Sequence, residues 1–212
     1  MGKSLIFAFV RIHISSEMAL PASFFLRPTL EVLDDLVGTV LVRRSKEGLT
    51  SGIIVEAEAY RGEDDPASFA FVGRTKRSEM LYKQPGKAFV YLIYGIHYLL
   101  NIITEKEGFP AAILIRAIEP LEGISLMKKR RKDEDLLNLC SGPAKVCQAL
   151  GIDLVMNDVM VTSSRSPLFI KERNIRNKGH IELVRRPRIG VSEGKDRLWR
   201  VYLKGSPFIS FA

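Results

Sequence analysis

The sequence predicts an α+β fold, in which a mostly antiparallel sheet or open barrel forms one domain with a few peripheral helices. Short apolar runs of the kind that form strands recur along the chain and are separated by polar turns. Only three stretches have the character of helices. No repeat, low-complexity tract or linker divides the 212 residues, so we expect a single core. We assign residues 18–212 to this domain and residues 1–17 to an N-terminal extension.

The first elements of the domain are a helix and a hairpin. The amphipathic helix has Thr29 as its expected cap and Gly38 as its expected stop. A strand over 39–42 follows, and a polar turn over 43–51 leads back into a second strand over 52–60. The two strands therefore predict an antiparallel hairpin.

The second strand is mostly apolar, yet it carries two carboxylates, Glu56 and Glu58. Regular alternation divides its side chains between two faces, one with Ile53, Val55, Ala57 and Ala59, the other with Ile54, Glu56, Glu58 and Tyr60. Two acids on one buried face should push each other's pKa values apart, and such a pair suits acid–base chemistry. The alternative is an edge strand with a wet outer face. Periodicity alone favours this alternative, because exposed acids on half-buried strands are common.

A loop over residues 61–77 comes next and ends in a basic cluster of Arg74, Lys76 and Arg77. Loops held by a rigid sheet often carry binding groups, so the cluster could grip phosphates. An isolated basic cluster is more often only solvated surface, and both interpretations stay open.

The remaining elements are expected as strands over 88–95 and 111–116, helices over 120–131 and 141–151, and short strand-like runs over 167–171, 189–191, 198–203 and 207–211. The helix over 120–131 ends in the basic run 128–132, which suits the negative end of a helix dipole or a nucleic-acid contact. The helix over 141–151 has Ser141 as its expected cap. Its N-terminus, with Lys145 nearby, is a candidate anion site.

Composition narrows the classes of partner and cofactor. The net charge of +8 and the pI near 9.6 make a polyanion a plausible partner, either nucleic acid or an acidic membrane. Two cysteines, Cys140 and Cys147, argue against a disulfide scaffold or a zinc site. The chain has no HExxH, P-loop or GxGxxG motif, so no metal or nucleotide cofactor is indicated.

The N-terminal apolar run over 5–10 is too short for a membrane span, and we expect a cytoplasmic protein. Met18 precedes a more conventional opening. Residues 1–17 are therefore a weakly ordered extension or a misassigned start.

Six stretches together resemble the alkyladenine (3-methyladenine) DNA glycosylase family. They are Val55–Tyr60, Pro85-Gly86, Val90–Gly95 with Asn101, Leu114–Gly123, Leu139–Lys145 and Lys204–Pro207. The resemblance runs from about Ser23 to the C-terminus in matching order. No single motif is sufficient, but six in register are highly specific.

The resemblance implies a monofunctional enzyme that flips a damaged purine out of duplex DNA and hydrolyses its N-glycosidic bond. Glu58 would be the general base that activates the attacking water, Arg116 would order Glu58 and the water, and Glu56 would be a supporting acid. No lysine occupies the position of a Schiff-base nucleophile, so lyase activity is not expected. The implied substrates are 3-methyladenine and other alkylated bases, with hypoxanthine as a further candidate. The implied enzyme is a monomer without a cofactor, nucleoid-associated in a prokaryote.

The resemblance also implies roles for residues that contact DNA. Tyr94 would enter the duplex through the minor groove and fill the vacated space. Tyr60 and Tyr91 would be the stacking walls of the base pocket, and Asn101 would reject the exocyclic amine of guanine. Residues implied to lie along the DNA backbone are Arg74, Arg77, Lys145, Ile189 and Gly190.

Two positions depart from the family pattern. Nine residues after Tyr60 the family usually has a histidine that stacks on the flipped base and hydrogen-bonds to it, whereas this chain has Phe69. We expect stacking to persist and recognition of the oxygen of hypoxanthine to weaken. The Thr-Pro-Arg-Asn stretch of the family is altered to Thr75-Lys-Arg-Ser78, which keeps the charge but not the shape.

Two other classes of function compete with the glycosylase. A nucleic-acid-binding module without catalysis would use the same charge and aromatic residues, and replacing Glu58 would leave its activity intact. A small-molecule hydrolase could use the Glu56/Glu58 pair, but it leaves the net charge and Tyr94 unexplained.

Overall fold

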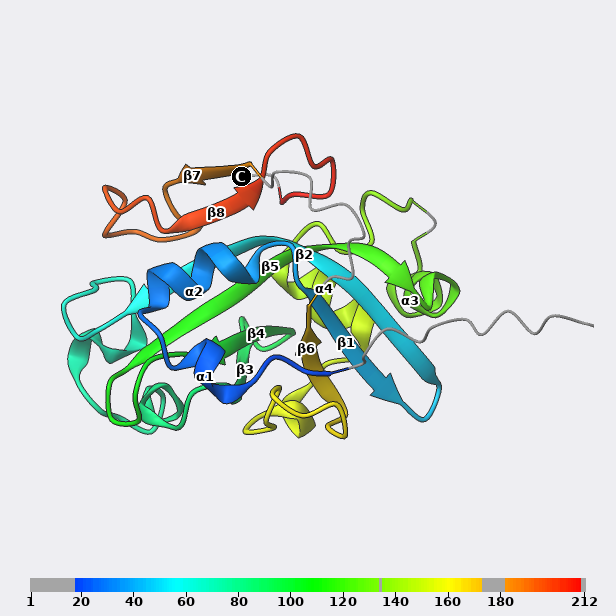
Figure 1. Cartoon of the computed structure of the whole chain (residues 1–212). Coiled ribbons are helices and arrows are strands. Elements are labelled where there is room, and N and C mark those ends of the chain that lie inside the picture. The colour runs from blue at the N-terminus through cyan, green and yellow to red at the C-terminus, as the bar shows by residue number, and fades with distance from the viewer. Residues whose placement is uncertain (1–17, 134, 173–181, 211–212) are drawn as a thin grey trace, which may run out of the picture.

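Two long neighbouring strands, β2 (Gly48–Arg61) and β5 (Ala111–Glu122), form the centre of an antiparallel sheet in the computed structural model, which describes residues 18–133, 135–172 and 182–210. The other strands are β1 (Val40–Ser45), β3 (Ala88–Ile93), β4 (His97–Ile103), β6 (Leu168–Lys171), β7 (Leu183–Arg186) and β8 (Arg200–Leu203). The main order is β3-β4-β5-β2-β1-β6, and β8 pairs with both β2 and β7. The sheet curls into an open half-barrel (Figure 1), which confirms the predicted α+β class.

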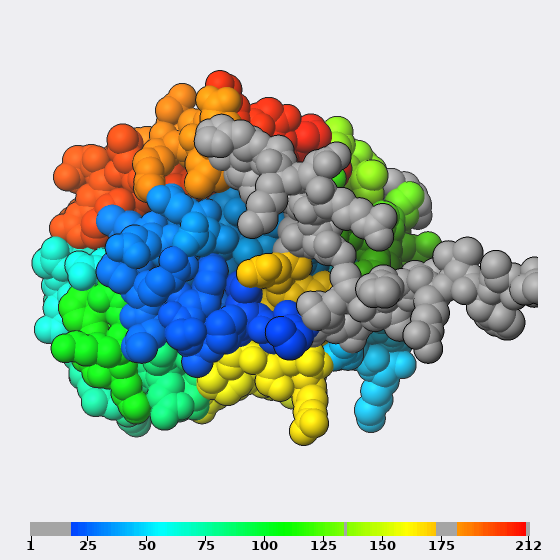
Figure 2. Space-filling view, in the orientation of Figure 1, coloured from blue at the N-terminus to red at the C-terminus, as the bar shows by residue number. Residues whose placement is uncertain are grey.

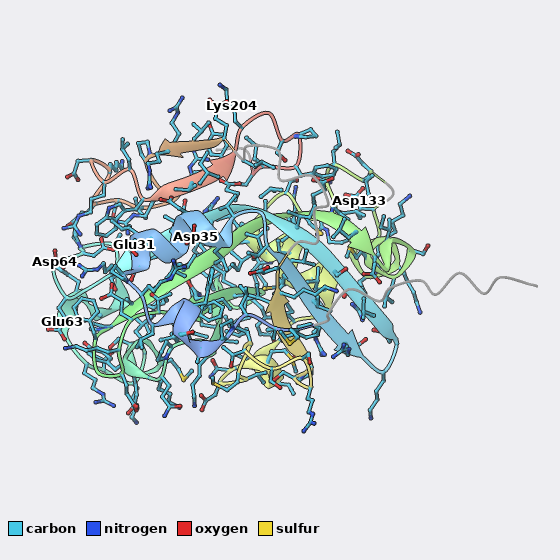
Figure 3. The ribbon with its side chains drawn as sticks, in the orientation of Figure 1. Glu31, Asp35, Glu63, Asp64, Asp133 and Lys204 are labelled. Carbon is cyan, nitrogen blue, oxygen red and sulfur yellow. The ribbon has the colours of Figure 1, made fainter. Side chains whose placement is uncertain are left out.

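In the described part of the chain, four short helices flank this sheet: α1 (Ala22–Phe25), α2 (Thr29–Leu36), α3 (Ile124–Arg131) and α4 (Pro143–Leu150). Three 3-10 turns complete the described elements: η1 (Phe69–Val72), η2 (Glu79–Tyr82) and η3 (Leu154–Met156). On α2, Val32, Leu33 and Leu36 are fully buried, whereas Glu31 and Asp35 lie on the outer surface (Figure 3). Burial of this apolar stripe fixes α2 against β2 and β5.

The β7–β8 segment near the end of the described chain lies beside helix α2. Figure 2 shows the segment around β7 and β8 against the N-terminal helices. An ion pair between Arg185 of β7 and Asp34 of α2 joins them. Strand β8 completes the sheet beside β2, with Tyr202 opposite Glu56 and Arg200 opposite Glu58. A segment from the end of the chain therefore covers the strand that carries both carboxylates.

Strand β2 departs from regular alternation just before its two carboxylates. The pairing of β2 with β5 shifts register between Ile54 and Ala57, as in a β-bulge, where one extra residue is inserted into a strand. Ile54 consequently packs in the main core with Ala57 and Ala59, while Ile53 and Val55 pack in a second cluster. The expected division of faces is wrong for the residues before the bulge. It holds for the carboxylates, because Glu56 and Glu58 both reach Arg116.

The alternative interpretation, an edge strand with a wet outer face, is also wrong. Strand β2 has neighbours on both sides, with β5 on one side and β1 and β8 on the other. Glu56 and Glu58 are completely buried, each with 0% exposure. A carboxylate in such a place is costly unless it is paired, so its partners become the central question of the site.

Several helices begin at, or are capped by, residues other than those expected. The helix expected over 120–131 begins at Ile124, because β5 continues to Glu122 and Gly123 turns the chain with a φ of +73°. The caps of α2 and α4 are Pro28 and Gly142. Thr29 instead donates its hydroxyl to Glu105 at 2.6 Å.

Two of the expected short strands, over 189–191 and 207–211, are not strands in their described parts. Residues 1–17 lie outside the described residues. No helix in the described ranges is both long enough and apolar enough to cross a membrane.

Candidate active site

Three donors hold the carboxylate of Glu58 in the middle of β2. The backbone N–H of Ile189 donates to Oε1 at 2.7 Å. The Tyr60 hydroxyl donates to Oε2 at 3.0 Å, and Nη1 of Arg116 lies 3.2 Å from the same oxygen. Both oxygens of this buried carboxylate are therefore satisfied, and its orientation is fixed.

Arg116, on β5, lies between the two glutamates. Its Nε is 3.3 Å from Oε1 of Glu56, and its Nε and Nη2 donate to the Ser210 hydroxyl at 3.2 and 3.1 Å. Glu56 also accepts the Ser210 N–H at 2.6 Å and Nη1 of Arg200 at 2.9 Å. Glu56 thus pairs with two arginines and, together with Ser210, fixes the guanidinium that faces Glu58.

Glu58 differs from an ordinary surface glutamate in its proton affinity. Burial raises the pKa of Glu58, and Arg116, the Ile189 N–H and the Tyr60 hydroxyl oppose this rise without cancelling it. Its carboxylate is accordingly a stronger base than a solvated one, and it remains hydrogen-bonded. Burial likewise raises the pKa of Tyr60, and it raises the pKa of Tyr91 to about 12, so both phenols stay neutral.

A cavity of about 480 Å³ opens above this carboxylate. Its lining comes from strands β2, β3, β4 and β5, the turns η1 and η2, helix α4 and the loops beside them. It includes Tyr60 of β2, Phe69 of η1, Tyr91 of β3, Asn101 of β4 and Arg116 of β5. The Phe69 and Tyr91 rings meet edge to face, with centroids 5.0 Å apart. Glu58 lies directly beneath the lining, because its partners Tyr60, Arg116 and Ile189 all contribute to it. The cavity can hold a flat, electron-poor ring against aromatic walls, with a carboxylate below.

The turn between β3 and β4 projects Tyr94 at the mouth of the cavity. Tyr94 and Gly95 both have positive φ angles, 53° and 73°, which make the tight reversal of a hairpin. Tyr94 is 85% exposed and Ile96 is 72% exposed, although both are large and apolar. Exposed apolar side chains concentrated at a turn often mark a contact surface.

Comparison with known proteins supplies the family. Residues 23–207 match the family model described as methylpurine-DNA glycosylase. A relative from Methanocella arvoryzae is 45% identical over 195 residues, which cover 90% of this chain and 95% of the relative. One from Prosthecochloris aestuarii is 43% identical over 190 residues, with 89% of each chain covered. Both relatives are named, provisionally, as 3-methyladenine DNA glycosylases.

The chain belongs to the methylpurine-DNA glycosylase family. The resemblance inferred from the six sequence motifs is thereby confirmed. Within this family, the buried glutamate and the aromatic cavity are the features of this chain that need a chemical explanation.

The residues expected along the DNA backbone do not all lie at the cavity. Arg77, Ile189 and Gly190 line it, and the Arg77 guanidinium lies 4.0 Å from the centre of the Phe69 ring. Arg74 does not line the cavity. It pairs with Glu79 at 3.4 Å and lies over the Tyr82 ring.

Lys145 is also absent from the lining. Its Nζ donates to Asn138 and, at 3.4 Å, to Ser141, although its neighbours Pro143 and Ala144 do line the cavity. The altered stretch Thr75–Ser78 is a turn in which the Ser78 hydroxyl accepts the Thr75 N–H and is hydrogen-bonded to the Thr75 hydroxyl. Lys76 and Arg77 are both exposed on this turn, and Arg77 lies toward the cavity, over the Phe69 ring.

Sequence reasoning missed several polar residues that hold the site together. Arg200 and Ser210 complete the shell of Glu56, while Asp65 and Arg188 form an ion pair with both side chains 0% exposed. Arg188 precedes the predicted Ile189, so its position in the chain was a usable signal. Asp65 stands among other acids in a loop, and nothing in its local sequence separates it from them. Among the described residues, no group of three or more His, Cys, Asp or Glu side chains could hold a metal ion.

Proposed function

We propose that this protein is a monofunctional DNA glycosylase that flips a damaged purine from duplex DNA and hydrolyses its N-glycosidic bond, with Glu58 activating the water. Its substrates would be 3-methyladenine and other alkylated purines. One observation supports this above all others: a fully buried, hydrogen-bonded glutamate of raised pKa lies beneath an aromatic cavity. Membership of the family supports the same reaction class.

In the proposed reaction, ionised Glu58 accepts a proton from a water molecule, and the oxygen of this water attacks C1′ of the flipped nucleotide. The bond between C1′ and the base nitrogen breaks, and its electron pair leaves with the base. A cationic alkylated base leaves as a neutral molecule, so it is a good leaving group. Arg116, 3.2 Å from Glu58, would keep the carboxylate in the orientation that the water requires.

Extrusion of the base has its own proposed device. A stacked base is out of reach of Glu58, and flipping it costs a few kcal/mol of unstacking. Tyr94 is exposed at the hairpin tip beside the cavity, where it could enter the space that the base vacates. The net charge of +8 would hold the enzyme, as a monomer, to the phosphates of double-stranded DNA.

Base selection would rest on the cavity walls. Tyr60, Phe69 and Tyr91 offer aromatic faces to an electron-poor alkylated ring, and the Asn101 amide would oppose the exocyclic amine of guanine. Phe69 cannot donate a hydrogen bond to a base oxygen. We therefore propose that hypoxanthine is a poorer substrate than 3-methyladenine.

Single-turnover release of 3-methyladenine from duplex DNA, compared between wild type and Glu58→Gln, tests the proposal. We expect wild type to release the base, and Glu58→Gln to bind damaged duplex without breaking the N-glycosidic bond. Glu63→Gln, which changes an exposed acid, is the matched control and should cut like wild type. If Glu58→Gln cuts normally, the proposed general base is wrong. If wild type binds DNA but releases no base, the protein is a binding module.

A further inference from the structure

Arg188 and Asp65 form a buried, two-pronged ion pair directly behind the cavity. Nη1 of Arg188 donates to Oδ2 of Asp65 at 2.6 Å, and Nη2 donates to Oδ1 at 2.7 Å. Both side chains are 0% exposed. This bidentate geometry fixes the plane of the guanidinium as well as its position.

The fixed guanidinium contacts the strand that carries Glu58. Nη1 also donates to the carbonyl of Ala59 at 3.0 Å, and Ala59 is the residue between Glu58 and Tyr60. The same guanidinium lies 4.8 Å from the centre of the Tyr60 ring and 5.2 Å from that of Trp199. Arg188 therefore holds both the backbone and the ring of the cavity wall.

The residue after Arg188 is the one whose N–H reaches the proposed general base. The Ile189 N–H donates to Oε1 of Glu58 at 2.7 Å. Because the Arg188 side chain is clamped by Asp65, the peptide that carries this N–H is clamped as well. Gly194 leaves room for the clamp: its φ is +64°, and a Cβ there would lie 2.8 Å from Nη2 of Arg188.

We propose that Arg188, held by Asp65, is a positioning residue that sets the Ile189 N–H on Glu58 and the Tyr60 ring against the cavity. The inference rests on the proposed function, because it assigns to the pair a role in the chemistry of Glu58. A buried ion pair is a poor device for stability alone, since apolar residues of similar volume often do as well. The contacts of Arg188 with the Ala59 carbonyl and the Tyr60 ring give the pair a use that apolar residues could not supply.

The chain provides a matched comparison for this pair. Arg197 and Asp64 are also an arginine and an aspartate, 3.5 Å apart, and Arg197 lies 4.5 Å from the centre of the Trp199 ring on which Arg188 also packs. Asp64, however, is 73% exposed and projects from the surface (Figure 3). The neighbouring aspartates thus each pair with an arginine, but the Asp65 pair is buried whereas Asp64 is exposed to solvent. Only Asp65 is connected to Glu58.

The proposal predicts a change in the pH profile. A hydrogen bond to the ionised carboxylate lowers its pKa, so a displaced Ile189 N–H raises the pKa of Glu58 further. Glu58 must be ionised to act as a base, and the acid limb of the rate should therefore move to higher pH. The other groups that bear on Glu58 are Arg116 of β5, Tyr60 and Glu56 of β2, Tyr91 of β3 and Arg188 itself. The substitutions below leave all but Arg188 chemically unchanged.

The test compares Asp65→Asn and Arg188→Lys with the control Asp64→Asn. Single-turnover release of 3-methyladenine is measured across pH, together with the Kd for duplex containing an uncleavable abasic-site analogue and the melting temperature. For Asp65→Asn and Arg188→Lys we expect a rate loss of about a hundredfold at neutral pH, since small displacements of reacting groups have effects of this size. We also expect an acid limb at higher pH and a Kd within about threefold of wild type. Asp64→Asn should match wild type throughout.

The position of the acid limb does not depend on how much of the protein is folded, so it separates positioning from stability. A lower rate that follows the melting temperature, with the acid limb of wild type, would overturn the proposal. A rate of 3-methyladenine release in Asp65→Asn equal to that of wild type would also overturn the proposal. Failure of the proposed function would look different, because Glu58→Gln would then keep its activity whatever happens at Arg188 and Asp65.

Discussion

The centre of the sheet and the tip of the β3–β4 hairpin are built in opposite ways. At the centre, Glu56, Glu58 and Arg116 are buried and each is held by several short polar contacts. At the tip, Tyr94 and Ile96 are 85% and 72% exposed. The centre is complete without a substrate, whereas the tip leaves apolar surface in water.

Under the proposed function, the centre of the sheet and the hairpin tip have different tasks. A carboxylate that activates water must be oriented before the substrate arrives, because reorientation during the reaction would add to the barrier. A side chain that enters a duplex must instead be accessible. Changes at the centre should therefore alter both stability and rate, and changes at the tip should alter only the handling of DNA.

Arg116→Met should have the largest effect. It removes the arginine that pairs with Glu58 and one of the two arginines that pair with Glu56. Breaking a buried pair by removing one partner typically costs about 3–5 kcal/mol. We expect a loss of that size in the free energy of unfolding, measured by denaturant titration, and little residual glycosylase activity. Arg27→Met removes the half-buried partner of the exposed Asp35, and this surface ion pair should be worth at most about 1 kcal/mol. Equal losses in the two variants would contradict the central role of Arg116.

Tyr94→Ala tests the tip of the β3–β4 hairpin. The side chain is exposed, so the melting temperature should stay unchanged. Loss of stacking worth about 1–3 kcal/mol should lower single-turnover excision from duplex by about 10- to 100-fold. Val155→Ala, which removes another exposed apolar group outside the cavity lining, should do neither. A stable Tyr94→Ala enzyme of normal rate would show that the tip does not take part in flipping.

Phe69→His tests the cavity wall between these two regions. A histidine could donate to the oxygen of hypoxanthine, and one hydrogen bond of about 1 kcal/mol corresponds to a gain of a few-fold. Release of hypoxanthine should rise by that amount relative to 3-methyladenine. Phe71→His places the same group on an exposed ring two residues further along and should change neither substrate. No gain for hypoxanthine in Phe69→His would refute the proposed effect of Phe69.

The raised pKa of Glu58 also predicts how stability varies with pH. A carboxyl group whose pKa is higher in the folded state binds more protons when folded, so stability falls as pH rises from the ordinary glutamate range through the folded pKa. Glu58→Gln lacks this titration. Thermal unfolding at a series of pH values should show wild type losing stability relative to Glu58→Gln across that window. A constant difference between the two proteins would mean that Glu58 does not titrate there.

Arg74→Gln should have the smallest effect, because Arg74 is exposed and lies outside the cavity lining. If it contacts a phosphate, binding of duplex should weaken equally for damaged and undamaged DNA, and the salt dependence of log K should decrease by about one unit of slope. Titrations at several salt concentrations measure this slope. Arg165→Gln, next to the edge strand β6, is the control and should leave it unchanged. An unaltered slope in Arg74→Gln would remove this residue from the interface.

The sequence predicted the fold class and the paired carboxylates because both depend on local pattern. Two glutamates in an apolar run are visible in any reading of the chain, as is the glycine after Tyr94. Pro120 was expected to begin a helix, but it lies in β5 opposite Gly52, where the register shifts and a ladder donor is not required. The bulge in β2 was equally invisible, because it is set by the pairing with β5.

The supporting polar residues were hidden for a different reason. Arg188 stands in a run with Arg185 and Arg186 and has the composition of solvated surface, yet it is buried. Its burial depends on Asp65, which lies 123 residues earlier in the chain. Local sequence shows which residues have the chemistry for a site, but the tertiary fold decides which of them lose contact with water.

The hydrogen bond from the Ser210 N–H to Glu56 has a consequence for how the protein becomes active. Its two residues are 154 positions apart, and Ile189 and Glu58 are 131 apart. Contacts of such long sequence separation form late, because closing a long loop must precede any gain from the contact. Until the end of the chain docks, two acids in β2 lack their full set of partners. We therefore expect completion of folding and onset of activity to coincide, so that a partly folded chain bound to DNA through its charge would not yet release a base.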